Sequence, residues 1–257
     1  MSKKDTAYLE KIRHTVGSTI ELFQLIKPND HILIGLSGGK DSLILTEILA
    51  LRRRYSLVPY TITAAHIKVK NIPYLIDKDF LQSFCDNLQV PFIYKEIEFE
   101  DDKQTESPCY FCAWSRRKEL FATARALQCN KLATGHHADD AIETMIMNMA
   151  MHGKISSIPA CFPLFNGDID FIRPMIQILE KDLTKYAEIQ SHKGLKNPCP
   201  FDHVTRRKEF RKIIEMIEAL HPNAKVNLFN SMSNWIPEYL PYHSSLKKTV
   251  DTKFSIE

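Results

Sequence analysis

The chain of 257 residues lacks the features that would place it in a membrane or an export pathway. It has no run of 18 apolar residues, and its first residues, MSKKDTAYLEKI, alternate charged and apolar groups instead of forming the apolar core of a signal peptide. Internal repeats and low-complexity tracts are also missing. The sequence therefore predicts no membrane partner and a cytoplasmic location.

Neither the charge nor the cysteine content is extreme. A formal net charge of +3 is too small to indicate a nucleic-acid partner and large enough to permit one. Six cysteines without an export signal argue against a disulfide framework and favour metal binding or a reactive thiol. Three of them, Cys85, Cys129 and Cys161, lie in or next to apolar stretches, so we expect them to pack in the core.

Short apolar runs alternate with segments of helical length. The runs are HILIGL, YTITAAHI, PFIYKEI and KLATG, and the helical segments that follow them are 42–54, 74–88, 113–127 and 140–151. Strands separated by helices imply right-handed crossovers and a mostly parallel sheet that is covered on both faces. This pattern predicts a doubly wound α/β fold, in which the turns after Leu36, His66 and Thr134 share one crevice at the carboxyl ends of the strands.

Helical segments flank this α/β domain. Apolar residues at spacings of three and four within 6–27 predict an amphipathic leading helix. Beyond the segment FIRPM the pattern predicts helices over 181–192 and 204–220 and no further strand. We therefore divide the chain into an N-terminal helix (1–28), an α/β domain (29–173), a C-terminal helical region (174–240) and a loose tail (241–257).

The segment SGGKDS, residues 37–42, joins the first predicted strand to the next helix. Backbone N–H groups at a helix N-terminus lack partners and bind anionic oxygens; the glycines let a phosphate approach, and Lys40 adds positive charge. It is not a Walker A loop, because Gly35 and Gly39 enclose only three residues and Asp41 follows the lysine. A carboxylate at this place indicates Mg²⁺ between Asp41 and the phosphates. The structural alternative, a tight turn capped by serine and aspartate, needs neither both glycines nor the lysine.

Two cysteines at CxxC spacing, Cys109 and Cys112 in PCYFCAWSRR, can bind one metal centre. A third candidate ligand, Cys199, lies between two prolines in NPCP. Three thiolates leave one position open, which suits a reactive iron–sulfur centre better than a closed structural zinc. Spacing alone also permits a structural zinc completed by His136 or His137, or a redox dithiol.

These motifs resemble those of a known family. SGGKDS resembles the PP-loop of the N-type ATP pyrophosphatases, and TGHHADDAIET (134–144) resembles the segment after the fourth strand in the branch that acts on tRNA. With the cysteines, the pattern resembles the tRNA 2-thiocytidine synthetase family over most of the chain, from VGSTIELFQLIKPNDHILIGLSGGKDSL to NPCP. The resemblance implies that ATP is cleaved between its α and β phosphates, that a pyrimidine C2 carbonyl is adenylated, and that sulfur replaces its oxygen.

The motifs and the resemblance together assign the candidate site residues. Lys40, Asp41 and Arg116 would be catalytic, with Arg116 steering tRNA or stabilising the adenylate from about one helical turn beyond the CxxC pair. Cys109, Cys112 and Cys199 would hold a [4Fe-4S] cluster whose fourth iron carries the sulfide. ATP and Mg²⁺ would be bound by Leu36, Ser37, Gly38, Gly39, Lys40, Asp41, Ser42, Ala65, Gly135, His136 and Asp140. The tRNA phosphates would be contacted by Arg116, Arg117, Arg206 and Arg207.

The resemblance also implies partners, and two other functions fit part of the pattern. The partners would be tRNA, a sulfur donor such as a cysteine desulfurase or free sulfide, and a second copy of the chain in a homodimer. A PP-loop ligase of the tRNA lysidine synthetase type carries a similar GHHxDDxxET segment, but it needs no cluster and leaves the three cysteines unexplained. A non-catalytic zinc or nucleotide-binding module would use both motifs structurally, and its colourless protein would differ from a brown, anaerobically purified thiolase.

Overall fold

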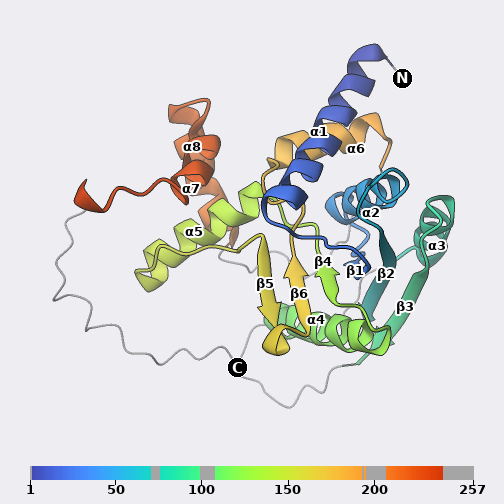
Figure 1. Cartoon of the computed structure of the whole chain (residues 1–257). Coiled ribbons are helices and arrows are strands. Elements are labelled where there is room, and N and C mark those ends of the chain that lie inside the picture. The colour runs from blue at the N-terminus through green and yellow to red at the C-terminus, as the bar shows by residue number, and fades with distance from the viewer. Residues whose placement is uncertain (1, 71–75, 99–107, 193, 195–206, 240–257) are drawn as a thin grey trace.

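The computed structural model describes residues 2–70, 76–98, 108–192, 194 and 207–239, with the side chains of 108–111 and 207 excluded. This part of the chain contains a six-stranded sheet in the order β3-β2-β1-β4-β6-β5 (Figure 1). The strands are β1 (Asp30–Gly35), β2 (Tyr60–Val69), β3 (Phe92–Ile97), β4 (Lys131–Ala133), β5 (Cys161–Leu164) and β6 (Ile169–Ile172). Neighbouring strands pair in parallel, except that β5 runs antiparallel to β6. The predicted doubly wound α/β fold is confirmed.

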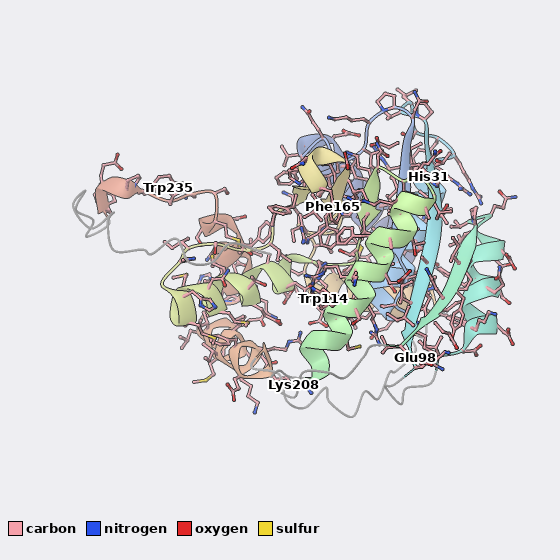
Figure 2. The ribbon with its side chains drawn as sticks, turned by 90° about the horizontal axis from the view of Figure 1, so that it is seen from below. His31, Glu98, Trp114, Phe165, Lys208 and Trp235 are labelled. Carbon is pink, nitrogen blue, oxygen red and sulfur yellow. The ribbon has the colours of Figure 1, made fainter. Side chains whose placement is uncertain are left out.

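Helices cover both faces of the sheet. They are α1 (Lys3–Leu22), α2 (Lys40–Arg52), α3 (Lys78–Asn87), α4 (Pro108–Ala126), α5 (Ala138–His152), α6 (Glu180–Ile189), α7 (Arg207–Leu220) and α8 (Ala224–Ser231), with short 3-10 turns at Phe165–Gly167 (η1) and Pro237–Tyr239 (η3). The helices α1, α2, α3 and α6 pack on one face, and α4 lies across the other (Figures 1 and 2). None of the described helices is both long and apolar enough to cross a membrane.

Alternation along the strands explains the two layers. In β1, Ile32 and Ile34 belong to the core under α2, whereas Leu33 belongs to the core under α4. Because both faces of β1 are buried, the strand reads as the continuous apolar run ILIG. The strand order reverses between β1 and β4, so the carboxyl ends of these two strands form the topological switch point at which doubly wound sheets bind ligands.

The hairpin of β5 and β6 and the helix α8 were missing from the sequence prediction. Both strands have only four residues, and β5 contains Pro163, which an edge strand tolerates because one side of it needs no ladder hydrogen bond. The turn between them places Phe165 and Asn166 at φ of 52° and 59°, conformations that few non-glycine residues adopt. The predicted tail, 241–257, lies outside the described residues.

A buried carboxylate joins three segments on the α2 side of the sheet. Glu47 of α2 is only 5% exposed and accepts hydrogen bonds from Arg13 Nη2 at 2.8 Å, Tyr186 Oη at 2.8 Å and Gln190 Nε2 at 2.7 Å. His192 Nε2 makes a further short contact with the other carboxylate oxygen. Burial opposes the charge, but the hydrogen bonds from His192 and Tyr186 outweigh it and lower the pKa of Glu47 to about 2. The network holds α1 and α6 against α2.

The last two helices pack on α5 and lie apart from the sheet (Figure 1). Arg211 Nε of α7 donates to Glu143 Oε1 at 2.8 Å, and Lys225 Nζ of α8 lies 3.0 Å from Asp139 Oδ1. Asp139 Oδ2 in turn accepts from the backbone N–H of Glu180 at the start of α6. Side chains that the segment TGHHADDAIET contributes to α5 therefore bind α7, α8 and the start of α6.

Candidate functional site

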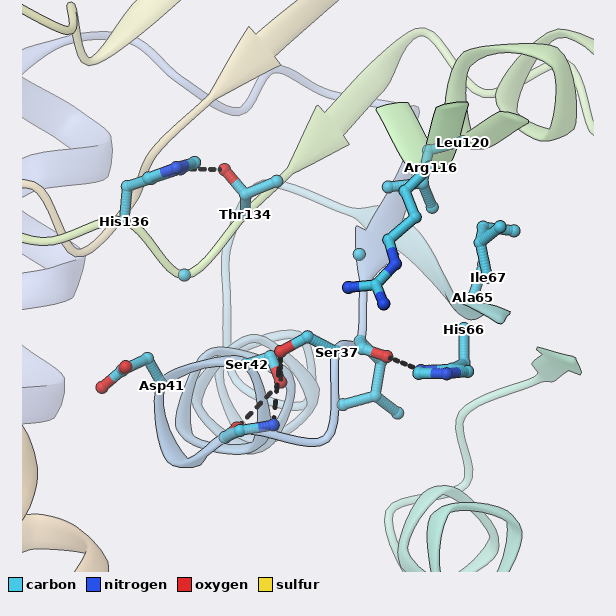
Figure 3. Close-up of a pocket in the computed structure, with 14 residues that line it drawn as sticks. Ser37, Asp41, Ser42, Ala65, His66, Ile67, Arg116, Leu120, Thr134 and His136 are labelled. Carbon is cyan, nitrogen blue, oxygen red and sulfur yellow. Dashed lines mark hydrogen bonds between the residues drawn. The ribbon is translucent and has the colours of Figure 1, made fainter. Parts of the chain in front are cut away.

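A cavity of about 310 Å³ opens at the carboxyl edge of β1, β2 and β4 (Figure 3). Its lining residues are Gly35, Leu36, Ser37, Gly39, Asp41, Ser42, Ala65, His66, Ile67, Arg116, Leu120, Thr134, Gly135 and His136. They come from the turns after β1 and β4, from the strand β2, and from α2 and α4. The prediction of one shared crevice is confirmed for the turns after Leu36 and Thr134, whereas no turn follows His66, because β2 continues to Val69 and lines the cavity from within the strand.

The SGGKDS turn presents the N-terminus of α2 to this cavity. Gly38 has φ +87°, a conformation that favours glycine, and Gly39 is the residue that precedes the helix. Ser37 Oγ accepts from the Gly39 N–H at 3.2 Å and donates to Ser42 Oγ at 3.1 Å, while Ser42 Oγ donates to the Gly39 carbonyl at 2.8 Å. The two hydroxyl groups thus shape the turn, and the N-terminal end of the α2 dipole favours an anion in the cavity.

Lys40 and Asp41 form a charged group at the start of α2. Lys40 Nζ lies 3.1 Å from Asp41 Oδ1 and 3.2 Å from Glu180 Oε1 of α6. Burial lowers the pKa of Lys40, but the two carboxylates outweigh it and raise that pKa above its ordinary value. Asp41 lines the cavity, and Lys40 is its neighbour outside the lining. A phosphate that entered the cavity would therefore compete with Glu180 for the ammonium group of Lys40.

The turn after β4 packs directly on the SGGKDS turn. A Cβ atom at Gly135 would lie 2.9 Å from the Asp41 carbonyl carbon and 3.1 Å from the Ser42 nitrogen. Gly194 packs against the first residue of α2 in the same way, because a Cβ atom there would lie 2.7 Å from the Lys40 backbone nitrogen. Next to Gly135, a 2.7 Å hydrogen bond joins Thr134 Oγ1 and His136 Nδ1. Only glycine permits these close approaches of backbone to backbone.

Replacing Gly135 by alanine is expected to raise the KM for ATP at least about tenfold, because the added methyl group must displace the backbone of Asp41 and Ser42. Gly17→Ala is the matched control, since the methyl group there meets the end of the flexible Arg52 side chain. Steady-state AMP formation against ATP concentration measures the effect. Equal KM values for the two variants would contradict the packing described here.

The opposite wall of the cavity comes from the end of β2. His66 Nδ1 donates to the Leu36 carbonyl at 2.8 Å, and its ring stacks on Tyr94 with centroids 5.7 Å apart. Burial lowers the pKa of His66, the Leu36 hydrogen bond partly opposes this, and the positive charge of Arg116 lowers it further. A neutral His66 therefore supports Leu36, the residue that precedes the SGGKDS turn. Ala65, Ile67 and Leu120 add apolar surface of the kind on which a nucleobase packs.

Five lining residues were not predicted: Gly35, His66, Ile67, Leu120 and Thr134. Four of them, Gly35, His66, Ile67 and Thr134, belong to the last residues of predicted strands, and the rule that ligands bind at carboxyl ends could have included them. Leu120 belongs to α4, and no local signal in the sequence points to it. Five predicted site residues whose side chains the structure describes do not line the cavity: Gly38, Lys40, Cys112, Arg117 and Asp140. Asp140 instead caps α5, accepting from the His137 N–H at 3.0 Å.

The helix α4 carries the CxxC pair in its first turns. Cys112 is 7% exposed and packs on Val69 of β2, one helical turn before Arg116, which lines the cavity. Positions 109 and 112 are three apart in one helix and therefore face the same side. Cys199 and Arg206 lie outside the described residues, as do the side chains of Cys109 and Arg207. Within the described residues, no three histidine, cysteine or acidic side chains are grouped to hold a metal.

Comparison with known proteins assigns this site to a family. Residues 9–216 match the family described as PP-loop domain. The chain belongs to the PP-loop family. This PP-loop chain is 31% identical over 252 residues to the tRNA-cytidine(32) 2-sulfurtransferase of Neisseria gonorrhoeae, a match that covers 93% of the chain and 78% of the relative. The tRNA-cytidine(32) 2-sulfurtransferase of Idiomarina loihiensis is 30% identical over 237 residues, covering 90% and 78%.

One solved structure has a similar fold. It is the U34-tRNA thiolase NcsA from Methanococcus maripaludis with its [4Fe-4S] cluster, which matches with a TM-score of 0.71 and 26% sequence identity. The match covers 90% of this chain and 79% of that one. The resemblance to the tRNA 2-thiocytidine synthetase group of PP-loop proteins is thereby confirmed.

Proposed function

We propose that this PP-loop protein is an ATP-dependent tRNA sulfurtransferase that adenylates a pyrimidine C2 carbonyl and replaces its oxygen with sulfur. The observation that carries the proposal is the position of α4, whose Arg116 enters the wall of the nucleotide cavity one helical turn after the buried Cys112. Relatives named tRNA-cytidine(32) 2-sulfurtransferase support cytidine as the substrate base.

The cavity suits the activation half of this reaction. The phosphates of ATP bind at the N-terminus of α2, where Lys40 offsets their charge, and the base packs on the apolar wall. The Asp41 carboxylate is an oxygen ligand of the type Mg²⁺ prefers, and it holds the ion against the phosphates. The C2 oxygen of the base attacks the α phosphorus, pyrophosphate leaves, and the base is left bound to AMP through that oxygen. Arg116 stabilises the negative charge that develops at the α phosphate.

The cysteines suit a [4Fe-4S] cluster, held by Cys109, Cys112 and Cys199. Thiolates are the preferred ligands of such clusters, and the buried position of Cys112 against Val69 would shield the centre from water. When bound, the cluster would supply the sulfide that displaces AMP. The identity of the sulfur donor, the homodimeric state and the cytoplasmic location stay predictions from the sequence.

The products of ATP cleavage test the proposal. Anaerobically purified protein given ATP, Mg²⁺, sulfide and unmodified tRNA is expected to release AMP and pyrophosphate in step with thionucleoside formation. Release of ADP and phosphate would rule out the PP-loop chemistry. If AMP formed only when free lysine replaced sulfide, the protein would instead be a lysidine-type ligase.

A further inference from the structure

One aromatic side chain near the nucleotide cavity is exposed to solvent. Trp114, one of two tryptophans in the chain, lies on α4 two residues after Cys112 and is 47% exposed. It does not line the nucleotide cavity, so the chemistry proposed above does not use it. A large aromatic ring exposed beside a catalytic cavity indicates a contact with another molecule.

The neighbours of Trp114 on the helix surface are cations. Arg117 and Lys118 follow it by three and four residues, which places them on the same side of α4. Both are exposed, and Lys118 Nζ lies over the indole ring, 5.1 Å from its centroid. We call these three residues the α4 platform. It combines an aromatic surface with two positive charges and includes no carboxylate.

Packing shows which way the platform faces. Phe121, seven residues after Trp114 and on the same side of α4, makes edge contacts with Phe171 of β6 and with Phe165, at centroid distances of 6.0 Å and 5.3 Å. Arg173, directly after β6, has its pKa lowered by burial and then by the positive charge of Arg117. The platform thus lies above β6, and Figure 2 shows Trp114 on the side of α4 turned toward α5.

Two opposite sides of α4 therefore face different sites. At 100° per residue, Arg116 is turned about 200° from Trp114, so one side enters the nucleotide cavity while the other presents the platform. A substrate bound on the platform would reach the adenylation site around the end of one helix. The two sides of α4 are separated by about the width of a helix, on the order of 10 Å.

We propose that the α4 platform binds a single-stranded loop of the RNA substrate, with an unpaired base stacked on Trp114 and phosphates on Arg117 and Lys118. This inference rests on the proposed function, because it takes RNA as the substrate. Proteins recognise single-stranded RNA by stacking splayed bases on aromatic rings and pairing phosphates with nearby cations, and the platform offers both. A protein partner would instead favour a wider apolar surface around the tryptophan than two flanking cations provide.

The two tryptophans allow a direct test. In the full-length Trp235→Phe protein, Trp114 is the sole tryptophan, so titration with an anticodon stem-loop RNA is expected to quench its fluorescence in a saturable way. Trp114→Ala is expected to weaken RNA binding about tenfold or more, since stacking of one base is worth roughly 1–3 kcal/mol. Trp114→Phe keeps an aromatic ring and should retain most of the affinity. Trp235→Ala is the matched control, because Trp235 is 66% exposed but belongs to a different part of the molecule.

Each outcome has a definite meaning. Quenching, loss of affinity in Trp114→Ala and retention in Trp114→Phe and Trp235→Ala would support the platform. If Trp114→Ala bound RNA as tightly as the parent and still thiolated it, the inference would fail and the proposed function would stand. If the parent protein neither bound RNA nor formed a thionucleoside, both would fail. Quenching by a cysteine desulfurase but not by RNA would overturn the platform as an RNA site.

Discussion

Replacing Asp41 by asparagine is expected to lower kcat/KM for AMP formation at least about 100-fold. The substitution keeps the size of the side chain and removes its charge from the wall of the cavity, next to Lys40. Under the proposed mechanism, Mg²⁺ would lose a ligand, and the phosphates would lose the neutralisation that the ion provides. Stability should change by less than about 1 kcal/mol, because the ion pair of Asp41 with Lys40 is partly exposed to water.

Asp79→Asn is the matched control for this effect. Asp79 also lies in the first turn of a helix, α3, but it is exposed and does not line the cavity. Initial rates of AMP formation for both variants, at several ATP and Mg²⁺ concentrations, measure the difference. A variant Asp41→Asn with the parent's kcat/KM would show that the carboxylate has no part in the reaction.

Replacing Glu47 by alanine is expected to lower the free energy of unfolding by about 3–5 kcal/mol, the largest effect on stability that we predict. The substitution leaves buried donors of Arg13, Tyr186 and His192 without their shared acceptor. Glu21→Ala is the control: its ion pair with Arg52 also joins two helices, but the Glu21 side chain is 73% exposed, so the loss should stay below about 1 kcal/mol. Denaturant unfolding of the two variants at pH 7 gives the comparison, and equal midpoints would contradict it.

The same residue predicts how stability depends on pH. The pKa of Glu47 is about 2 in the folded protein against an ordinary value of 4.5, so its folded-state pKa is depressed. The corresponding stabilisation, about 3 kcal/mol, is fully present above pH 4.5 and is lost as the pH falls from there to about 2. Glu47→Gln should lose this part of the acid sensitivity. Unfolding curves for both proteins between pH 6 and pH 3 would disprove the assignment if their slopes against pH were identical.

The parts of the fold that the sequence predicted are those with local signals. The run HILIGLSGGKDS encodes a buried strand, a glycine turn and a helix start within twelve neighbouring residues, and the structure has all three. The same holds for CxxC and Arg116, whose relative positions follow from the geometry of one helix. In contrast, the hairpin of β5 and β6 has short strands, one of them with a proline, and carries little periodic signal.

The parts that the sequence did not predict depend on residues that are far apart in the chain. Glu47 looks like one charged residue in an apolar helix until Arg13, Tyr186 and His192 are seen to surround it. Gly194 has no motif of its own, and its close approach to Lys40 exists only after α6 packs on α2. His66 belongs to a predicted strand, but its hydrogen bond to Leu36 requires the pairing of β1 with β2. Tertiary packing creates these contacts, so no local pattern could report them.

The most direct test of the central claim is a mass-spectrometric comparison of tRNA nucleosides from cells with the intact gene, without it, and with Asp41→Asn or Cys112→Ala in its place. We expect 2-thiocytidine to disappear in the deletion strain and in both variants, and to return when the parent protein is supplied. Unchanged 2-thiocytidine in the deletion strain would contradict the assignment of this PP-loop protein as a tRNA sulfurtransferase that forms this nucleoside.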